Sequence, residues 1–103
     1  MFGEILLCEF PLTSGAPGKT RPALLLFDLG TDALIARVTS VARHGLLDVT
    51  LEDWRAAGLL RPSVARLDRL VTAERSVFRR QLGVLSARDA DAVRDRWNKH
   101  MTL

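Results

Sequence analysis

Short apolar runs, each closed by turn-forming residues, recur along most of this chain and limit what it can fold into. The candidate strands span residues 3–10, 22–28, 33–40, 46–51, 64–73 and about 76–82. The connection over residues 28–32 is so short that the strands on either side of it should form a hairpin. Five or six short strands joined by brief turns predict a small, mainly β domain built as a barrel or half-barrel.

The C-terminal residues change from a strand pattern to a helical one. Ser86 is a suitable N-cap, with Asp89 at the third helical position. Apolar residues then recur at helical spacing, at Ala90, Val93, Trp97 and Met101. We therefore expect a terminal helix whose apolar stripe packs on the sheet.

A second, shorter helix is predicted after the fourth strand. Thr50, followed three residues later by Asp53, resembles a capping box. The helix would run through Ala57, and Gly58 is well placed to end it. The ring of Trp54 lies within this helix, and core packing is its expected use.

Size and composition narrow the class of protein. A chain of 103 residues with 48% hydrophobic residues can bury one core, so we expect a single domain over residues 1–103. The sequence has no long uninterrupted apolar run, which excludes a membrane span. The first residues, Met1 to Glu4, lack the basic region of a secretory signal. The single cysteine, Cys8, rules out an internal disulfide and fits a reducing compartment, so we expect a cytoplasmic protein.

The basic residues are almost all arginine. The formal net charge is only +3, and of the 15 basic residues just Lys19 and Lys99 are lysines. Guanidinium groups match phosphate oxygens with a planar fork and stack on bases, which suits a nucleic-acid partner. A GC-rich genome that favours arginine codons explains the same bias equally well, and both explanations stay open.

One glycine-rich segment invites a nucleotide-binding interpretation that fails. Residues 15–20 read GAPGKT, but the phosphate-loop pattern needs a glycine where Thr13 stands. It also needs a helix next, whereas Arg21 and Pro22 lead into a strand. Lys19 and Arg21 remain as two loop cations suited to contacting a backbone phosphate.

The pair Arg66 and Asp68 is the most specific candidate for chemistry. Residues two apart in a strand point to the same face, roughly 6.5 Å apart. The two side chains could therefore bracket a phosphodiester, with Asp68 taking a proton from a ribose 2′-hydroxyl and Arg66 neutralising charge on phosphorus. Taken alone, such a pair is more often a surface ion pair worth little.

Hydroxyl groups close the third strand. Thr39 and Ser40 could donate hydrogen bonds to a phosphate or a base edge, although alone they are more often ordinary strand residues. The period of two places Arg37 on the same face as Thr39. His44 and His100 are treated as surface residues, and no cysteine or histidine spacing matches a metal site, so no metal or other cofactor is expected.

Six segments in this order resemble the PemK/MazF/Kid toxins of type II toxin–antitoxin systems. They read GEILLCEFP, TSG, KTRPALLL, VTS, GLLRPSVARLD and a final LG before the terminal helix. The resemblance implies a small SH3-like β-barrel of the CcdB/Kid type, mainly β with α additions, that forms a homodimer. Most members are metal-independent endoribonucleases. They cut single-stranded mRNA through attack of the 2′-hydroxyl, leaving a 2′,3′-cyclic phosphate and a 5′-hydroxyl.

The resemblance also implies residue roles. Asp68 matches the general base of Kid, and Arg66 matches its acid or phosphate stabiliser. Thr39 and Glu4 match residues that orient the substrate, and Arg21 matches the arginine of the RP motif that acts with the TS threonine. A cognate antitoxin would cover the same basic groove with an acidic tail.

Two other functions remain as alternatives. A CcdB-like poison of DNA gyrase shares the fold but relies on a terminal Trp-Gly-Ile, whereas this chain ends in Met101, Thr102 and Leu103. The pair Arg66 and Asp68 also favours the nuclease, because binding-only relatives lack it. The third possibility is a degenerate member that binds RNA or an antitoxin without cutting.

Overall fold

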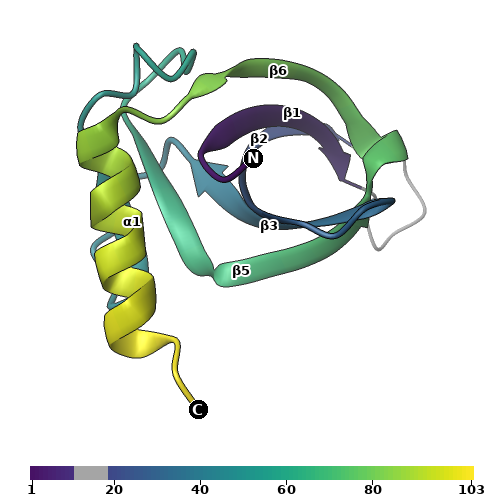
Figure 1. Cartoon of the computed structure of the whole chain (residues 1–103). Coiled ribbons are helices and arrows are strands. Elements are labelled where there is room, and N and C mark those ends of the chain that lie inside the picture. The colour runs from purple at the N-terminus through teal and green to yellow at the C-terminus, as the bar shows by residue number, and fades with distance from the viewer. Residues whose placement is uncertain (11–18) are drawn as a thin grey trace.

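Six antiparallel strands form one sheet, with a single long helix at the C-terminus (Figure 1). This computed structural model describes residues 1–10 and 19–103. The strand order across the sheet is β4-β5-β3-β2-β1-β6. The elements are β1 (Glu4–Phe10), β2 (Lys19–Asp28), β3 (Asp32–Thr39), β4 (Asp48–Leu51), β5 (Ser63–Glu74), the 3-10 turn η1 (Arg75–Val77), β6 (Phe78–Val84) and α1 (Ala87–His100).

All six predicted strands are present, and their first residues differ from the predicted ones by about one to three positions. β4 begins at Asp48 rather than at residue 46. β2 begins at Lys19, three residues earlier than predicted, because β1 continues to pair with it there. The assignment of Lys19 and Arg21 to a loop is therefore wrong, and both lie on a strand. The TSG motif and residues 15–18 of the glycine-rich segment lie outside the described residues.

The sheet curls because several strands carry irregular pairings. On β3 the neighbours Ala36 and Arg37 pair with Leu70 and Arg66 of β5, so three residues of β5 bulge between two successive pairs. Bulges of this kind bend a strand and increase its twist. Figure 1 shows the resulting corner in β5 and the near-ring that the sheet forms. Over the described residues the sheet is not closed, since β4 and β6 are its two edges.

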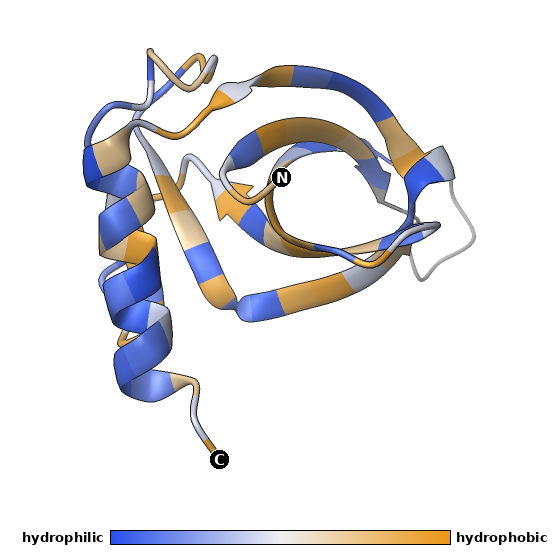
Figure 2. Cartoon of the chain, viewed as in Figure 1, coloured by the Kyte–Doolittle hydropathy of each residue, from blue (hydrophilic) through white to orange (hydrophobic). Residues whose placement is uncertain are grey.

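Alternate residues of the central strands bury against two separate apolar clusters. In β2, Leu24 and Leu26 enter the main core, while Ala23 and Leu25 enter a second cluster on the other face. Two-sided burial explains why these strands read as nearly continuous apolar runs (Figure 2). The main core also receives α1, through Val93, which is 1% exposed.

The terminal helix is confirmed in its cap and in most of its stripe. The Ser86 hydroxyl accepts a hydrogen bond from the Asp89 N–H, as the N-cap prediction requires. Ala90, Val93 and Trp97 pack in the main core, whereas Met101 is the C-cap residue. Figure 2 shows α1 as mostly hydrophilic, with only short hydrophobic stretches. Among the described residues, no helix combines the length and apolar character that crossing a bilayer requires.

The predicted short helix after β4 is wrong, because residues 52–58 form a series of turns. Thr50 does not cap them. Instead the carboxylate of Asp89, fully buried on α1, accepts hydrogen bonds from the N–H groups of Glu52 and Asp53 at 2.9 and 2.8 Å. A capping oxygen supplied from outside the segment fixes its first turn against α1 without requiring regular helix.

Asp53, which lies in these turns, also links them to α1 through hydrogen bonds of its side chain. Its carboxylate accepts from the Ser86 hydroxyl at 2.6 Å and from Arg88 Nη2 at 2.6 Å. These hydrogen bonds, the one from Arg88 first, hold the pKa of Asp53 below its ordinary value. Its stabilising contribution is therefore present at neutral pH and is lost as the pH falls through that lowered pKa.

We expect Asp89→Ala to lower the free energy of unfolding by about 2–3 kcal/mol, because two backbone N–H groups lose a charged acceptor in a buried place. Urea unfolding followed by circular dichroism measures the change. The matched control is Asp91→Ala on the same helix, where an exposed ion pair with Arg94 is lost and the cost should stay below about 0.5 kcal/mol. Equal effects of the two substitutions would contradict this role of Asp89.

Candidate functional site

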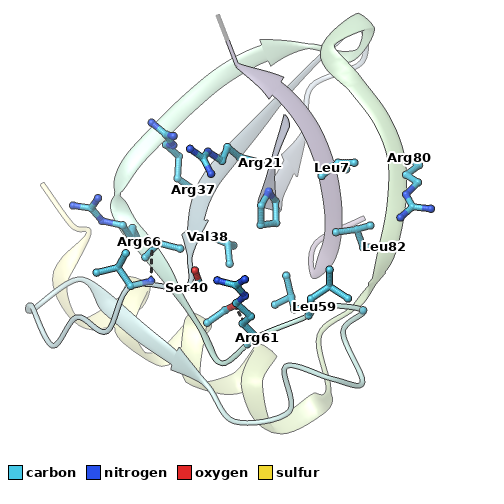
Figure 3. A pocket seen from close by; sticks show the side chains of 16 residues that line it. Leu7, Arg21, Arg37, Val38, Ser40, Leu59, Arg61, Arg66, Arg80 and Leu82 are labelled. Carbon is cyan, nitrogen blue, oxygen red and sulfur yellow. Dashed lines mark hydrogen bonds between the residues drawn. The ribbon is translucent and has the colours of Figure 1, made fainter. Parts of the chain in front are cut away.

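A groove with a volume of about 790 Å³ opens where the curled sheet meets the segment before β5. Strands β1, β2, β3, β5 and β6 all contribute to its walls, and Figure 3 shows it from close by. The lining residues are Leu7, Arg21, Pro22, Arg37, Val38, Thr39, Ser40, Val41, Gly58, Leu59, Leu60, Arg61, Ser63, Arg66, Arg80 and Leu82.

The groove concentrates positive charge. Five of its lining residues are arginines. Among the described residues that line the groove, none is an aspartate or a glutamate. The whole chain carries a formal charge of only +3, so the groove is far more basic than the average surface. A cleft lined by one sign of charge focuses the field and attracts polyanions. The arginines are Arg21, Arg37, Arg61, Arg66 and Arg80, and Figure 3 shows Arg21 and Arg37 on one side with Arg80 on the other.

Strand register explains why two of these arginines meet. Arg37 on β3 and Arg66 on β5 are directly opposite each other, and like charges so placed are destabilising. On its other side Arg66 is opposite Asp48 of β4, whose Oδ1 lies 3.9 Å from Arg66 Nε. A neighbouring carboxylate thus offsets part of the repulsion.

Asp48 is held in place by its own surroundings. Its side chain is only 5% exposed, and its Oδ2 accepts a hydrogen bond from the Gly45 N–H at 2.8 Å. The same oxygen lies 3.6 Å from Arg43 Nε. On α1, Arg96 donates to the carbonyl of Asp48 at 3.0 Å, which fixes the backbone as well. Asp48 is therefore a rigid anchor beneath Arg66, whose buried Nε has no hydrogen-bond partner in the described part of the chain.

Arg21 and Thr39 lie towards the same end of the sheet. Ala23 pairs with Arg37. Arg21 is two residues before Ala23 on β2 and Thr39 is two residues after Arg37 on β3, so both lie at the same end of this antiparallel pair. Thr39 Oγ1 accepts from the Val41 N–H at 3.1 Å, which orients the hydroxyl and leaves its hydrogen to donate. Both side chains line the groove, as does Ser40.

Three of the predicted site residues are not on the groove wall. Asp68 lies in the bulge of β5, 46% exposed, with its Oδ1 at 3.9 Å from Arg66 Nε. Glu4 lies at the start of β1, where its carboxylate pairs with the N-terminal amine at 2.5 Å. Lys19 is exposed at the start of β2. The structure thus brings together Arg21, Thr39, Ser40 and Arg66, and leaves Asp68 beside them.

Sequence reasoning missed three groove arginines. Arg37 carried a signal, because the period of two had already placed it on the face of Thr39. Arg61 lies in the GLLRPSVARLD segment that carries the resemblance but was given no role, and Arg80 carried no signal, since it lies on β6, far along the chain from the RP and TS motifs. Only the curl of the sheet brings these distant segments to one groove.

Other reactive side chains lie outside the groove lining. His44 is exposed and His100 is half-buried on α1. Cys8 is buried, and burial raises the pKa of its thiol to about 11, so it stays protonated near neutral pH. Within the described residues no three histidine, cysteine, aspartate or glutamate side chains gather as a metal site.

Comparison with known proteins identifies the family. Residues 1–101 match the family model of the PemK-like, MazF-like toxins of type II toxin–antitoxin systems. This chain belongs to the PemK/MazF toxin family. The match spans nearly the whole sequence and includes the RP, TS and R-x-D segments from which the resemblance was inferred. A search of curated protein sequences returned no match.

Solved structures of MazF-like toxins share the fold. The Mycobacterium tuberculosis toxin MazF-mt6 is 24% identical, with a TM-score of 0.76 and 93% of each chain covered. A mycobacterial endoribonuclease in complex with its cognate antitoxin is 13% identical, with a TM-score of 0.78 over 98% of this chain and 93% of that one. MazF in a MazE–MazF structure from Deinococcus radiodurans is 23% identical, with a TM-score of 0.76 over 96% and 92%. The fold class predicted from the resemblance is confirmed, apart from the short inserted helix.

Proposed function

We propose that this PemK/MazF toxin is a metal-independent endoribonuclease that cuts single-stranded mRNA at a sequence-specific site. One observation carries the proposal: in a chain of this family, a groove built from five arginines and no described acidic residue also holds the hydroxyl of Thr39. Such a groove suits a flexible polyanion, because each planar guanidinium can donate two parallel hydrogen bonds to a backbone phosphate. The endoribonuclease among the structural neighbours supports the same activity.

In the proposed reaction the ribose 2′-oxygen forms a bond to phosphorus and the bond from phosphorus to the 5′-oxygen breaks. The products are a 2′,3′-cyclic phosphate and a 5′-hydroxyl. Arg21 and Arg66 stabilise the negative charge that develops on the phosphoryl oxygens, and Thr39 donates a hydrogen bond that positions the phosphate. The leaving oxygen receives its proton from Arg66 or from water.

The proton of the 2′-hydroxyl needs an acceptor, for which Asp68 is our proposal. Two carboxylates contact Arg66, each with an oxygen 3.9 Å from its Nε. Asp48 is 5% exposed and is fully engaged as an anchor, whereas Asp68 is 46% exposed and open to a substrate. Accessibility therefore favours Asp68 as the base and Asp48 as a support.

The remaining predicted residues take binding roles in this proposal. Lys19 lies two residues before Arg21 on β2, so it extends the basic strip beyond the groove. Ser40 lies on the groove wall beside Thr39. The role of Glu4 in orienting substrate stays a prediction, as does the homodimer. We further propose that a cognate antitoxin covers the groove with an acidic segment, since both ligands would present anions to the same arginines.

The direct test is to incubate the purified protein with a long RNA in EDTA and to map cut sites by primer extension. We expect cutting to persist in the chelator, with 5′-hydroxyl ends, and to be lost with Asp68→Asn or Arg66→Ala. The exposed Asp91→Asn on α1 is the matched control and should leave cutting unchanged. Full activity of both site variants would refute the site assignment. Binding of RNA without cutting by the wild type would favour a degenerate member.

Salt should weaken RNA binding steeply. If each of the five groove arginines contacts one phosphate, a plot of log K against log salt has a slope of about −3.5, at about 0.7 for each contact. Replacing Arg80 by glutamine should make the slope shallower by about 0.7, whereas Arg94→Gln on α1 should not change it. Fluorescence anisotropy with a 2′-O-methyl RNA measures both. An identical slope for wild type and Arg80→Gln would show that phosphates bypass this side of the groove.

A further inference from the structure

Asp48 contributes to the groove without lining it, because its two carboxylate oxygens face different partners. Its Oδ1 lies 3.9 Å from the Nε of Arg66, which is on the groove wall. Its Oδ2 accepts a hydrogen bond from the Gly45 N–H at 2.8 Å and lies 3.6 Å from Arg43 Nε. One oxygen is therefore held by the segment that precedes β4, and the other is available to orient Arg66.

The Nε of Arg66 is a buried donor whose bonding depends on where Asp48 lies. Within the described residues this atom has no hydrogen-bond partner. The Oδ1 atoms of Asp48 and Asp68 are each 3.9 Å away, beyond the usual N–H···O length of about 2.7–3.2 Å. Buried donors are normally paired. The position of the nearby carboxylates therefore decides which bond this Nε completes when a substrate engages the guanidinium.

The strand register places the side chain of Asp48 beside Arg66 and directs its carbonyl to the free edge of the sheet. The Leu67 N–H donates to the Leu47 carbonyl, so Asp48 and Arg66 form a non-hydrogen-bonded pair. Side chains in such pairs are the closer ones of an antiparallel ladder. In the described sheet β4 is an edge strand, so the Asp48 carbonyl points away from β5.

Arg96 of α1 covers part of this edge. Its Nη1 donates to the carbonyls of Leu46 and Asp48, at 2.8 and 3.0 Å. The carbonyl of Asp48 is thus fixed from α1, and its carboxylate is fixed by Gly45. Because Asp48 is held at both groups, it cannot follow Arg66 when a phosphate draws on the guanidinium. It therefore gives Arg66 a constant reference position.

We propose that Arg96 is a positioning residue for RNA cleavage, which fixes the guanidinium of Arg66 by holding the β4 backbone at Asp48. Arg96 does not itself line the groove, so its effect on the reaction passes through β4. This inference rests on the proposed function, since it requires Arg66 to stabilise charge on the phosphoryl oxygens. If Arg96 only fastened α1 to the sheet, its loss would lower stability and leave the cleavage rate of the folded protein unchanged.

Cleavage kinetics of Arg96→Ala test the proposal. Because Arg66 acts on charge that develops in the transition state, its displacement should lower kcat at least about tenfold, while KM and the affinity for a 2′-O-methyl RNA change less than about twofold. Arg96→Lys keeps a donor for the two carbonyls and should restore part of kcat. The matched control is Arg88→Ala on the same helix, which loses two hydrogen bonds to Asp53 and should keep the wild-type kcat. All assays are run well below the melting temperatures of the variants.

A double-mutant cycle separates positioning from general loosening. Asp48→Asn removes the charge that faces Arg66 and should by itself lower kcat about tenfold. If Arg96 acts through Asp48, adding Arg96→Ala to Asp48→Asn should lower kcat by less than about another twofold. Losses that multiply to about a hundredfold would show that Arg96 acts by a separate route, and would overturn the inference.

The Nε–H signal of Arg66 in NMR spectra is a readout that needs no RNA. It is assigned by its loss in Arg66→Lys, and its hydrogen should exchange slowly with water because the Nε is buried. Arg96→Ala and Asp48→Asn should shift this signal and speed its exchange, whereas Arg88→Ala should leave it unchanged. The inference falls if either kcat or this signal is unchanged in Arg96→Ala. Failure of the wild type to cut RNA would instead overturn the proposed function, and the signal would still test the link from Arg96 to Arg66.

Discussion

Replacing Arg21 by alanine is expected to lower kcat/KM for RNA cleavage by roughly 10²- to 10³-fold, the usual loss when one preorganised donor to transition-state charge is removed. Arg21 lies on β2 beside the end of β3, where it shares the groove wall with Thr39. Its side chain is exposed, so the fold should tolerate the change. Cleavage of a fluorogenic RNA containing the mapped site measures the effect.

Two further variants separate charge from geometry. Arg21→Lys keeps the positive charge but loses the planar fork, so binding should survive better than cleavage. Arg94→Ala removes an exposed arginine from α1 and should leave kcat/KM unchanged. If Arg21→Ala and Arg94→Ala behave alike, the RP arginine has no part in the reaction.

Gly58→Ala is expected to lower the free energy of unfolding by about 4 kcal/mol. The backbone of Gly58 has φ +85°, which costs an L-residue about 1–2 kcal/mol. An added Cβ would also stand 2.1 Å from the carbonyl oxygen of Leu82 on β6. Overpacking costs about 1–3 kcal/mol, and the upper end applies because a backbone carbonyl cannot swing aside. Urea unfolding measures the change, and expression in the folded fraction gives a first indication.

Gly30→Ala is the matched control because Gly30 has nearly the same φ, +89°, with no atom within 4 Å of an added Cβ. It should cost only the conformational part, about 1–2 kcal/mol. The difference between the two variants therefore reports the close approach of the turns at residues 52–58 to β6. Equal costs would mean that β6 moves away without penalty.

The strands were predictable because their signals are local. Alternating or continuous apolar runs, ended by proline, glycine and charged residues, mark β1, β3 and β6 whatever their partners are. The Ser86 cap is equally local, since its hydroxyl bonds an N–H three residues away. The prediction of a short helix after β4 was wrong because the decisive hydrogen bonds there are not local. Its first N–H groups are satisfied by Asp89, at least 36 residues further along the chain.

The residues of the candidate site also divide into those found from local sequence and those whose position depends on the folded sheet. Arg21, Thr39 and Arg66 were found from short motifs and from the resemblance that these carry. Asp68 was placed beside Arg66 by the period of two, and the bulge in β5 then set it at the margin of the groove.

The sequence by itself determined the family, the six strands, the capped terminal helix and the residue types available for phosphate chemistry. Tertiary structure alone decided that five arginines share one groove and that Asp48 anchors one of them. The physical reason is the separation along the sequence over which each kind of interaction acts. Periodicity and caps act over a few residues, whereas charge concentration depends on how bulges curl the sheet and bring distant strands together.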